Sequence, residues 1–204
     1  MQKTTELSGL LPERAELSGA RLRLFSTALV LFGERGYHGV SVRDITDALG
    51  QKPGAIYAHV QSKQELLYEL VRIGHAEHRE RLRAALETAN PDPVSQIRAI
   101  VIAHVRVHLE YVALARVANH EFRFLDEQQI ETILAVQAES EFLLLDVIER
   151  GRQTGEFGVA DARLAVSAIG SMGVRTAEWW RPDLRISPDH LAETYADFAV
   201  NLLR

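Results

Sequence analysis

The strongest constraint on the fold comes from the segment 41–63, which has the pattern of two short helices joined by a glycine and followed by a third helix start. Ser41 places a side-chain oxygen where it can accept an N–H of a first helical turn, and Val42 and Ile45 then fall on one apolar side. Gly50 ends this helix, because glycine takes up the left-handed conformation without strain. The spacing predicts a helix-turn-helix, a motif that binds DNA.

The second helix of the segment covers only about residues 52–59 and begins with a proline that suits a first helical position. A helix this short is not stable alone, so it must dock on other elements through an inward anchor, for which we expect Ile56. Its remaining positions point outward and are expected to meet a DNA groove. These positions are Lys52, Pro53, Gly54, Ala55, Tyr57 and His59.

A third helix is predicted to begin at Ser62, because Ser62 and Glu65 have the spacing of a capping box. Lys63 lies in its first turn, where a positive charge beside unpaired backbone N–H groups suits a phosphate. The predicted DNA-binding residues divide by role. Phosphate contacts are expected from Tyr57, His59 and Lys63, base-edge or groove contacts from Arg43, Gln51, Lys52 and Ala55, and the set is completed by Ser41, Pro53 and Gly54.

Several residues in and before this segment match a known pattern in order and spacing. They are Ala28 and Phe32, Gly36-Tyr37, Val42-Arg43-Asp44-Ile45, Gly54-Ala55-Ile56-Tyr57, His59, Ser62-Lys63 and Leu66. Through them, residues 21–66 resemble the DNA-binding domain of the TetR family of bacterial transcriptional repressors. The resemblance implies a double-stranded DNA operator as partner.

Four positions depart from the family pattern. Thr46 stands where a small apolar residue is usual, and Gln51 where an aliphatic one is. Lys52 replaces the customary serine cap, and Ala58 stands where a larger, contact-making side chain is common. Because Gln51, Lys52 and Ala58 lie in and beside the second helix, the resemblance implies the family without implying the operator sequence.

The formal net charge of −5 at first disfavours a nucleic-acid partner. Residues 1–63, however, hold eight Lys or Arg against six Asp or Glu, a balance of +2, so the remainder carries −7. This asymmetry directs the N-terminal part toward DNA. A balance of +2 predicts few phosphate contacts per subunit, so affinity is expected to depend on two subunits binding one site.

Features missing from the sequence bound the cellular context. There is no cysteine, which excludes a disulfide framework and a thiolate metal site. No run approaches the ~20 apolar residues that a membrane span requires. The N-terminus lacks the basic-then-apolar pattern of a secretory signal. We therefore expect a cytoplasmic protein with no membrane partner.

The remaining sequence has helical periodicity, without the alternation of strands. The predicted fold is all-α with about nine helices: an N-terminal three-helix helix-turn-helix DNA-binding domain and a C-terminal helical domain for ligand binding and dimerisation. The expected parts are a flexible N-terminal arm at 1–17, the DNA-binding domain at 18–65 and the ligand-binding and dimerisation domain at 66–204. The expected helices cover about 18–35, 41–49, 52–59, 62–89, 93–110, 112–125, 127–153, 161–181 and 188–203.

Two C-terminal patterns bear on the oligomeric state. The segment 166–174 is rich in small side chains, which allow another helix to approach closely, and an apolar stripe runs along the final helix. Both patterns also fit an intramolecular core. The family resemblance implies that the two final helices pair with their copies in a second subunit, which places two recognition helices one DNA turn apart. We expect a homodimer with an interface at Ile169, Gly173, Tyr195, Phe198 and Leu202.

Polar and aromatic residues gather at 104–124 and 175–182, as expected of a small-molecule site. The order from Arg175 to Pro182 is similar to that of TetR-like regulators that respond to acyl-CoA thioesters. Such a ligand is chemically suitable, because arginine can pair with pyrophosphate and tryptophan can stack on adenine. A surface ion pair between Arg175 and Glu178, with the tryptophans at the dimer interface, is the alternative. The expected effector-binding residues are His104, His108, Tyr111, Phe122, Arg175, Glu178 and Trp179.

Two further functions compete with this interpretation. His104 and His108 stand one helical turn apart, a metal-ligand spacing, and His120 or Glu121 on the next helix can supply a third ligand of a metal-responsive regulator. The second competing function is that of a helical module that binds another protein and never contacts DNA. The sequence has no nucleophile elbow, phosphate-binding loop or His-Glu-x-x-His helix, so we expect no catalytic residues, no resident cofactor and no enzymatic activity.

Overall fold

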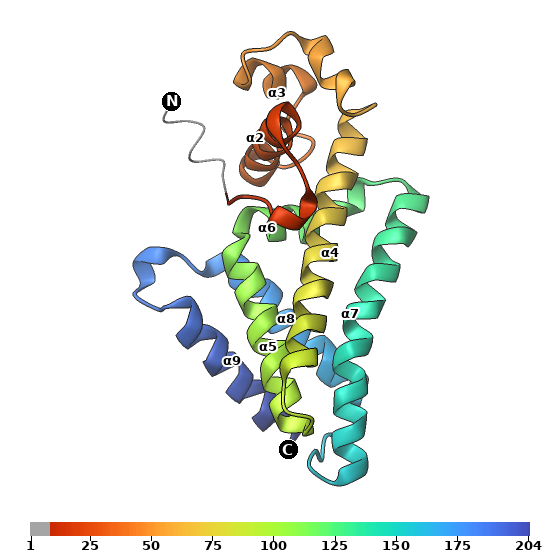
Figure 1. Cartoon of the computed structure of the whole chain (residues 1–204), viewed down its shortest axis with the longest axis vertical. Helices are drawn as coiled ribbons and strands as arrows, with labels where there is room; N and C mark the ends of the chain where they lie inside the picture. The colour runs from red at the N-terminus through yellow and green to blue at the C-terminus, as the bar shows by residue number, and fades with distance from the viewer. Residues whose placement is uncertain (1–8) are drawn as a thin grey trace. The chain divides into compact units, whose positions relative to one another are not determined.

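The structure is a computed structural model that describes residues 9–204, and these residues form α-helices and short 3₁₀ helices with no strand (Figure 1). The all-α prediction is confirmed. None of the helices described is long and apolar enough to cross a membrane. The α-helices are α2 (Gly19–Arg35), α3 (Val42–Ala48), α4 (Lys63–Thr88), α5 (Pro93–Glu110), α6 (Val112–His120), α7 (Glu127–Thr154), α8 (Ala162–Trp179) and α9 (Pro188–Leu203). The 3₁₀ helices are η1 (Glu13–Ala15), η2 (Pro53–Ala58), η3 (Phe122–Phe124) and η4 (Pro182–Leu184).

Side-chain caps set the start of several helices. Asp161 accepts the N–H groups of Arg163 and Leu164 at 2.9 and 3.0 Å and so begins α8. Ser187 accepts the N–H of His190 at 3.1 Å at the start of α9. Each cap satisfies backbone donors that the first helical turn leaves without a partner, which is why these helices begin at a polar residue.

Chain contacts divide the molecule into two compact units. The N-terminal unit comprises the chain up to His75 together with Tyr111–Ile133, and the C-terminal unit comprises Ala76–Glu110 together with Leu134–Arg204. In the N-terminal unit, α2 packs on α3 and α6, and α3 packs on η2. Its core is apolar and includes the fully buried side chains of Phe25, Phe32, Ile45, Ile56, Leu66 and Leu70.

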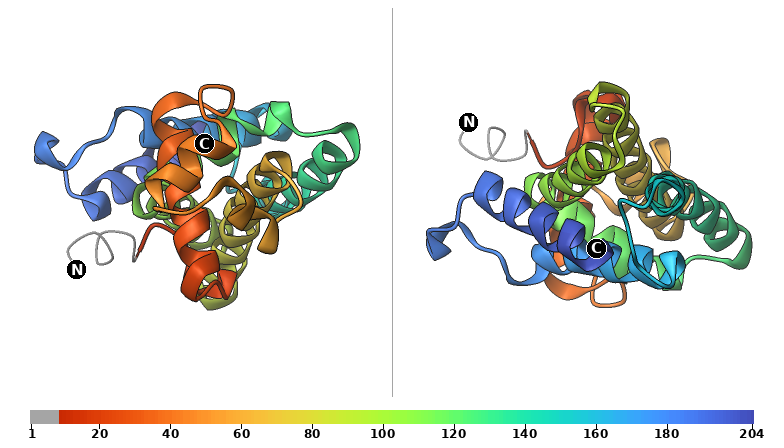
Figure 2. Two further views of the ribbon diagram at one scale, coloured as in Figure 1. Left: turned by 90° about the horizontal axis from the view of Figure 1, so that it is seen from above. Right: turned by 90° about the horizontal axis from the view of Figure 1, so that it is seen from below.

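The C-terminal unit is organised around α5, which packs on α8 and α9. The view from below in Figure 2 shows these three helices together, with α9 in dark blue. Arg98 of α5 reinforces the packing, because its guanidinium binds Glu193 of α9 at 2.7 Å and Asp197 one turn further on. The buried apolar residues of this unit include Ile97, Ile100, Val147, Ile148, Ile169 and Ala196.

The two units do not follow the expected domains 18–65 and 66–204. Helix α4 contributes residues to both units, and the segment 111–133 belongs to the N-terminal unit. Packing explains this assignment, because α6 lies against α2 in the same unit. A boundary based on local sequence breaks cannot reveal such a return of the chain.

The expected flexible arm covers residues 1–17, of which 1–8 lie outside the described residues. The part that is described packs on the N-terminal unit: Leu11 is buried, and Leu10, Ala15 and Leu17 lie against the same core. The short helix η1 forms within it. These apolar side chains do not follow a helical pattern, so the sequence did not indicate that they are covered.

Candidate nucleic-acid interface and effector-binding residues

The start of α3 has the capping chemistry that the sequence predicts. The Ser41 side chain accepts the N–H of Asp44 at 3.1 Å, and the Asp44 carboxylate accepts the N–H of Ser41 at 2.7 Å. The hydrogen bonds from Ser41 hold the pKa of the Asp44 carboxyl below its usual range. Gly50 follows α3 with a φ of +66°, which brings the chain into the turn. Helix α3 is thereby fixed at both ends.

The 3₁₀ helix η2 is the second helix of the predicted motif. Ile56 is fully buried in the core of the N-terminal unit, whereas the neighbouring Tyr57 has 58% of its surface exposed. Two of the expected DNA-contacting residues in η2 and its flanks, Ala55 and His59, are half-buried. The others in this region are exposed. Exposed members are Ser41, Arg43, Gln51, Lys52, Pro53 and Gly54. A single apolar anchor therefore leaves one row of this element facing outward.

Arg43 lies on the exposed side of α3 and forms a 3.6 Å ion pair with Asp47, one turn along the helix. Both side chains are mostly exposed, so the pair contributes little to stability and separates readily. The guanidinium is therefore accessible to a base edge or a phosphate. Arg43 and Lys52 are positive side chains on this exposed surface.

Lys63 has a structural role that the sequence did not indicate. Its ammonium donates to the backbone carbonyls of Tyr37 at 2.9 Å and Val40 at 2.7 Å, and it lies 4.0 Å from the centroid of the Tyr37 ring. Burial lowers the pKa of the ammonium, while the charge of Asp44 opposes this shift. Lysine has three N–H donors, so at most one remains for a phosphate. Lys63 holds the turn between α2 and α3.

Glu121, at the end of α6, fixes the same turn. Its carboxylate accepts the N–H of Tyr37 at 2.9 Å, across 84 residues of sequence. The Tyr37 ring stacks on Phe124, with 6.0 Å between centroids. We call Tyr37, Lys63 and Glu121 the turn clamp. From the sequence, Glu121 was expected within the polar segment of a small-molecule site or as a third metal ligand, because no local signal connects it with Tyr37.

The expected effector-binding residues do not form one group. Tyr111 and Phe122 are half-buried and pack against the core of the N-terminal unit. On α8, in the C-terminal unit, Arg175 pairs with Glu178 at 3.0 Å, and the Arg175 side chain is 69% exposed. This is the surface ion pair given above as the alternative to an acyl-CoA site. Trp179 is partly exposed beside it.

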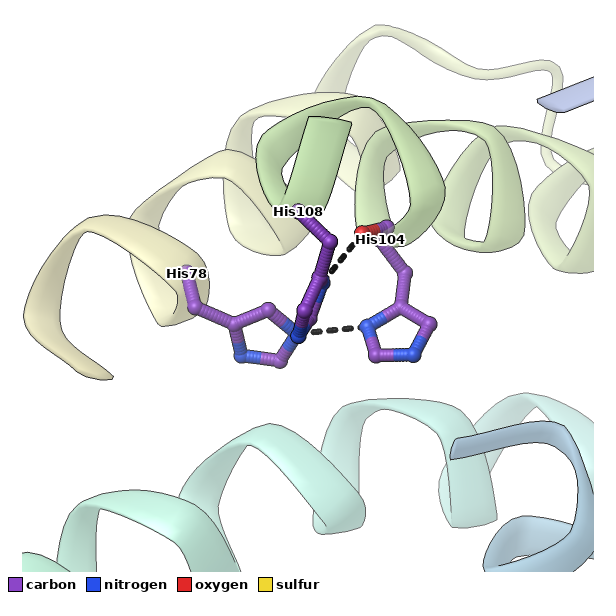
Figure 3. A group of neighbouring side chains, drawn as sticks. All are labelled: His78, His104 and His108. Carbon is purple, nitrogen blue, oxygen red and sulfur yellow. Dashed lines mark hydrogen bonds between the residues drawn. The ribbon is translucent and has the colours of Figure 1, made fainter. Parts of the chain in front are cut away.

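His104 and His108 of α5 are buried and meet a third histidine, His78 of α4, all within the C-terminal unit (Figure 3). One ring nitrogen from each lies within 4.8 Å of the other two. We call these residues the histidine cluster. Burial lowers the pKa of His104, while its hydrogen bond to Gly170 opposes the shift, so the ring is neutral near pH 7. The third member is His78 and not His120 or Glu121, which belong to the N-terminal unit.

The structure corrects two of the expected dimer residues. Ile169 is 1% exposed in the core of the C-terminal unit. Gly173 is also buried, and a Cβ at this position would lie 2.0 Å from the His104 ring. Both positions are therefore occupied within one chain and cannot meet a second subunit. The small residues of 166–174 include Gly173, which makes room for an imidazole of the same chain.

The outer sides of α8 and α9 carry exposed apolar side chains. Leu164 on α8 is 69% exposed, and Phe198 and Leu202 on α9 are 52% and 46% exposed. Tyr195 is half-buried, with its ring 6.0 Å from that of Phe198. Three of the five expected interface residues thus lie where a partner can reach them, and Leu164 is an addition that sequence periodicity did not single out.

Two protein-family models match the chain. One, described as "Bacterial regulatory proteins, tetR family", covers residues 24–70. The other, described as "Tetracyclin repressor-like, C-terminal domain", covers residues 90–203. A curated relative, the HTH-type transcriptional repressor KstR2 of Rhodococcus jostii (strain RHA1), is 28% identical over 194 residues, which is 90% of this chain and 91% of the relative.

Solved structures show the same fold. A bacterial regulatory protein in the tetR family from Rhodococcus RHA1 is similar with a TM-score of 0.85 and 28% identity, covering 92% of this chain and 98% of its own. AibR, solved in complex with isovaleryl coenzyme A and operator DNA, is similar with a TM-score of 0.77 and 23% identity, covering 88% of this chain and 95% of its own. At that identity the second likeness concerns the fold alone.

Proposed function

The chain belongs to the TetR family of bacterial regulatory proteins, and we propose that it represses transcription by binding a palindromic operator as a homodimer, which a small-molecule effector releases. The family and the relatives are DNA-binding regulators and not enzymes. The observation that carries the proposal is the outward row of η2, held by the buried Ile56 and leaving Lys52, Pro53, Gly54 and Tyr57 exposed.

DNA is favoured over a protein partner by the capping chemistry as well as by the family. The capped start of α3 and the Gly50 turn fix the backbone before η2, and the turn clamp fixes the backbone before α3. A rigid, short element with exposed polar and small residues suits a groove of fixed width. A protein-docking surface would instead gather several apolar anchors, whereas the outward row of η2 carries the single aromatic Tyr57 among small and polar residues, and Ile56 faces inward.

A direct test measures the affinity of the purified protein for the DNA upstream of its own gene, with random DNA of equal length as competitor. We expect saturable binding with two chains per site and a clear preference for the upstream fragment. The affinity should fall with salt, because released counterions drive the phosphate contacts. Equal affinity for the upstream fragment and for random DNA would contradict a specific operator there, and binding to neither would favour the protein-interaction function.

Release by an effector requires that the ligand prefer a protein arrangement with weaker operator affinity. The coupling is reciprocal, so operator DNA must weaken effector binding by the same factor. Helix α4 contributes residues to both units. In our proposal, α4 transmits the effector's preference for one protein arrangement to the DNA-binding residues.

We propose an acyl-CoA thioester as the effector class. Arg175 pairs with Glu178, but its side chain is 69% exposed, so the pair separates readily and leaves the guanidinium available to a ligand. Trp179 is exposed one turn further along α8, and Arg181 and Arg185 are exposed in the segment that follows. Guanidinium groups beside an indole suit a pyrophosphate and an adenine. AibR, which has a similar fold, was solved with isovaleryl coenzyme A, and this makes an acyl-CoA the first class to test.

The effector proposal is tested by titrating isovaleryl-CoA and free CoA into the protein–operator complex. The thioester should lower operator affinity, and Arg175→Ala should weaken the response without changing operator affinity in the absence of ligand. Arg83→Ala is the matched control, because it removes an exposed guanidinium from α4, outside this segment, and should leave the response unchanged. If neither compound binds, the effector belongs to another chemical class.

A further inference from the structure

We propose that His78, His104 and His108 form a binding site for a divalent transition-metal ion of the zinc class, a property that goes beyond the proposed DNA-binding function. Three imidazoles from two helices converge on one point inside the C-terminal unit, and their nearest ring nitrogens lie within 4.8 Å of one another (Figure 3). Three histidines with one open position are a donor set found around zinc.

The backbone fixes which nitrogen each buried ring offers. His104 Nε2 lies 3.0 Å from the carbonyl of Gly170, and a carbonyl can only accept, so the proton is on Nε2 and the lone pair is on Nδ1. His108 Nδ1 lies 2.7 Å from the carbonyl of His104, so its lone pair is on Nε2. Both tautomers are assigned from these hydrogen-bond partners. In each ring, therefore, one nitrogen is held by a backbone carbonyl and the other nitrogen can bind a metal ion.

His78 completes the set. Its Nε2 lies 2.7 Å from His104 Nδ1, and because that nitrogen holds a lone pair, His78 donates the shared proton. A metal ion takes the place of this proton between the two nitrogens, and the proton moves to His78 Nδ1, so the ring stays neutral. Tetrahedral Zn²⁺ places its ligand nitrogens roughly 3.3 Å apart, which requires the rings to shift by at most roughly 1.5 Å.

Helix α8 is shaped to hold His104 in this orientation. A Cβ at Gly173 would lie 2.0 Å from the ring Cδ2 and 2.1 Å from Nε2, so any other residue would displace the ring. Gly170, one turn earlier on α8, supplies the carbonyl that accepts from Nε2. A hydrogen-bonded outer partner that orients a ligating histidine is a regular component of metal sites.

The donor set selects the kind of ion. The cluster offers three imidazole nitrogens, and the sequence contains no cysteine for softer ions such as Cu⁺. Imidazole suits Zn²⁺, Cu²⁺, Fe²⁺ and Ni²⁺, whereas Mg²⁺ and Ca²⁺ prefer oxygen. The site therefore takes a borderline divalent ion with a water in the remaining position.

The test uses the full chain without an affinity tag, stripped with a chelator and titrated with Co²⁺ and then Zn²⁺ in the absence of DNA. We expect one ion per chain and the visible absorption of tetrahedral Co²⁺, which Zn²⁺ displaces. His78→Gln should weaken binding at least tenfold. Because His78 is only half-buried, this variant is expected to keep its fold, which circular dichroism and thermal melting check.

Two more variants separate a built site from histidines that bind at random. Gly173→Ala keeps all three histidines in the sequence but displaces the His104 ring. It should weaken metal binding by about tenfold or more. His190→Gln removes an exposed histidine outside the cluster and should change nothing. The proposal is overturned if no saturable binding with one ion per chain occurs, or if His78→Gln binds as the unaltered chain does. Neither result depends on operator binding, so the DNA-binding proposal stands or falls separately.

Discussion

His75 on α4 is a histidine whose surroundings favour the neutral form. Burial lowers its pKa from 6.5 to about 4, and the hydrogen bond of its ring to the carbonyl of Ala118 at 3.3 Å opposes the shift only in part. The unfolded chain therefore takes up a proton near pH 6.5, and the folded chain takes it up only near pH 4. The contribution of His75 to stability is complete above pH 6.5 and is lost as the pH falls toward 4.

We predict that His75→Leu flattens the dependence of the unfolding free energy on pH between 6.5 and 4. The loss attributable to His75 over this window is about 3 kcal/mol, from about 1.4 kcal/mol for each pH unit between the two pKa values. His104 is also held neutral by burial, so the slope decreases but does not vanish. Urea titrations at several pH values measure the dependence of the unfolding free energy on pH. His190→Gln should keep the full slope, and an unaltered slope in His75→Leu would contradict the assignment.

Lys63 and Lys52 lie in the same motif but are predicted to act differently. Lys63→Met keeps the apolar stem and removes two charge-assisted hydrogen bonds of the turn clamp, so it should lower the unfolding free energy by about 1–3 kcal/mol. Lys52→Met alters an exposed side chain and should change stability by no more than about 0.5 kcal/mol. Lys52 was expected at a base edge or groove, but because it is exposed beside η2 we now predict a phosphate contact for it. The salt dependence of operator binding should then decrease by about one unit of slope for Lys52→Met.

Urea unfolding and operator titrations at several salt concentrations measure both effects. If Lys63→Met lowers the salt slope and leaves stability unchanged, Lys63 is a phosphate contact, as expected from the sequence. The structure favours the clamp because the ammonium is already held by two carbonyls.

Among the secondary-structure elements, η2 depends on one inward residue and acts through its outward ones. Ile56→Ala should destabilise the fold by about 2–5 kcal/mol, because it empties a fully buried position. Tyr57→Ala should leave stability nearly unchanged, since the side chain is 58% exposed, and should weaken operator binding at least tenfold. Thermal melting and fluorescence anisotropy distinguish the two. A Tyr57→Ala variant with unaltered operator affinity would show that the outward row of η2 does not face DNA.

Element boundaries were predictable where a cap defines them. Ser41, Gly50 and Pro53 act within one helical turn of their own position, so the sequence alone locates α3 and η2. Gly173 of α8 was expected at the dimer interface because no such local signal defines its neighbour. Glycine permits close approach but does not specify what approaches, and at Gly173 it is the His104 ring of the same chain.

For the molecule as a whole, the proposed homodimer depends on the exposed apolar side of α8 and α9. Phe198→Glu places a charge at the centre of the proposed interface and should convert the dimer to a monomer. Operator affinity should fall with it, because a monomer binds one half-site. Sedimentation equilibrium measures the mass. Phe142→Glu makes the same change at a 64% exposed phenylalanine of α7 and should leave the dimer intact. A dimer that survives Phe198→Glu would place the interface elsewhere.

The helical class, the capped helix-turn-helix and the outward residues of its second helix could all be predicted without coordinates. These features follow from interactions within a few residues, which spacing and residue type express directly. Four others depended on packing: the buried side of α8, the return of residues 111–133 to the N-terminal unit, the clamp of Tyr37 by Lys63 and Glu121, and the meeting of His78 with His104. Their physical reason is common: each joins side chains from segments distant in the sequence, and only the tertiary fold brings those segments together.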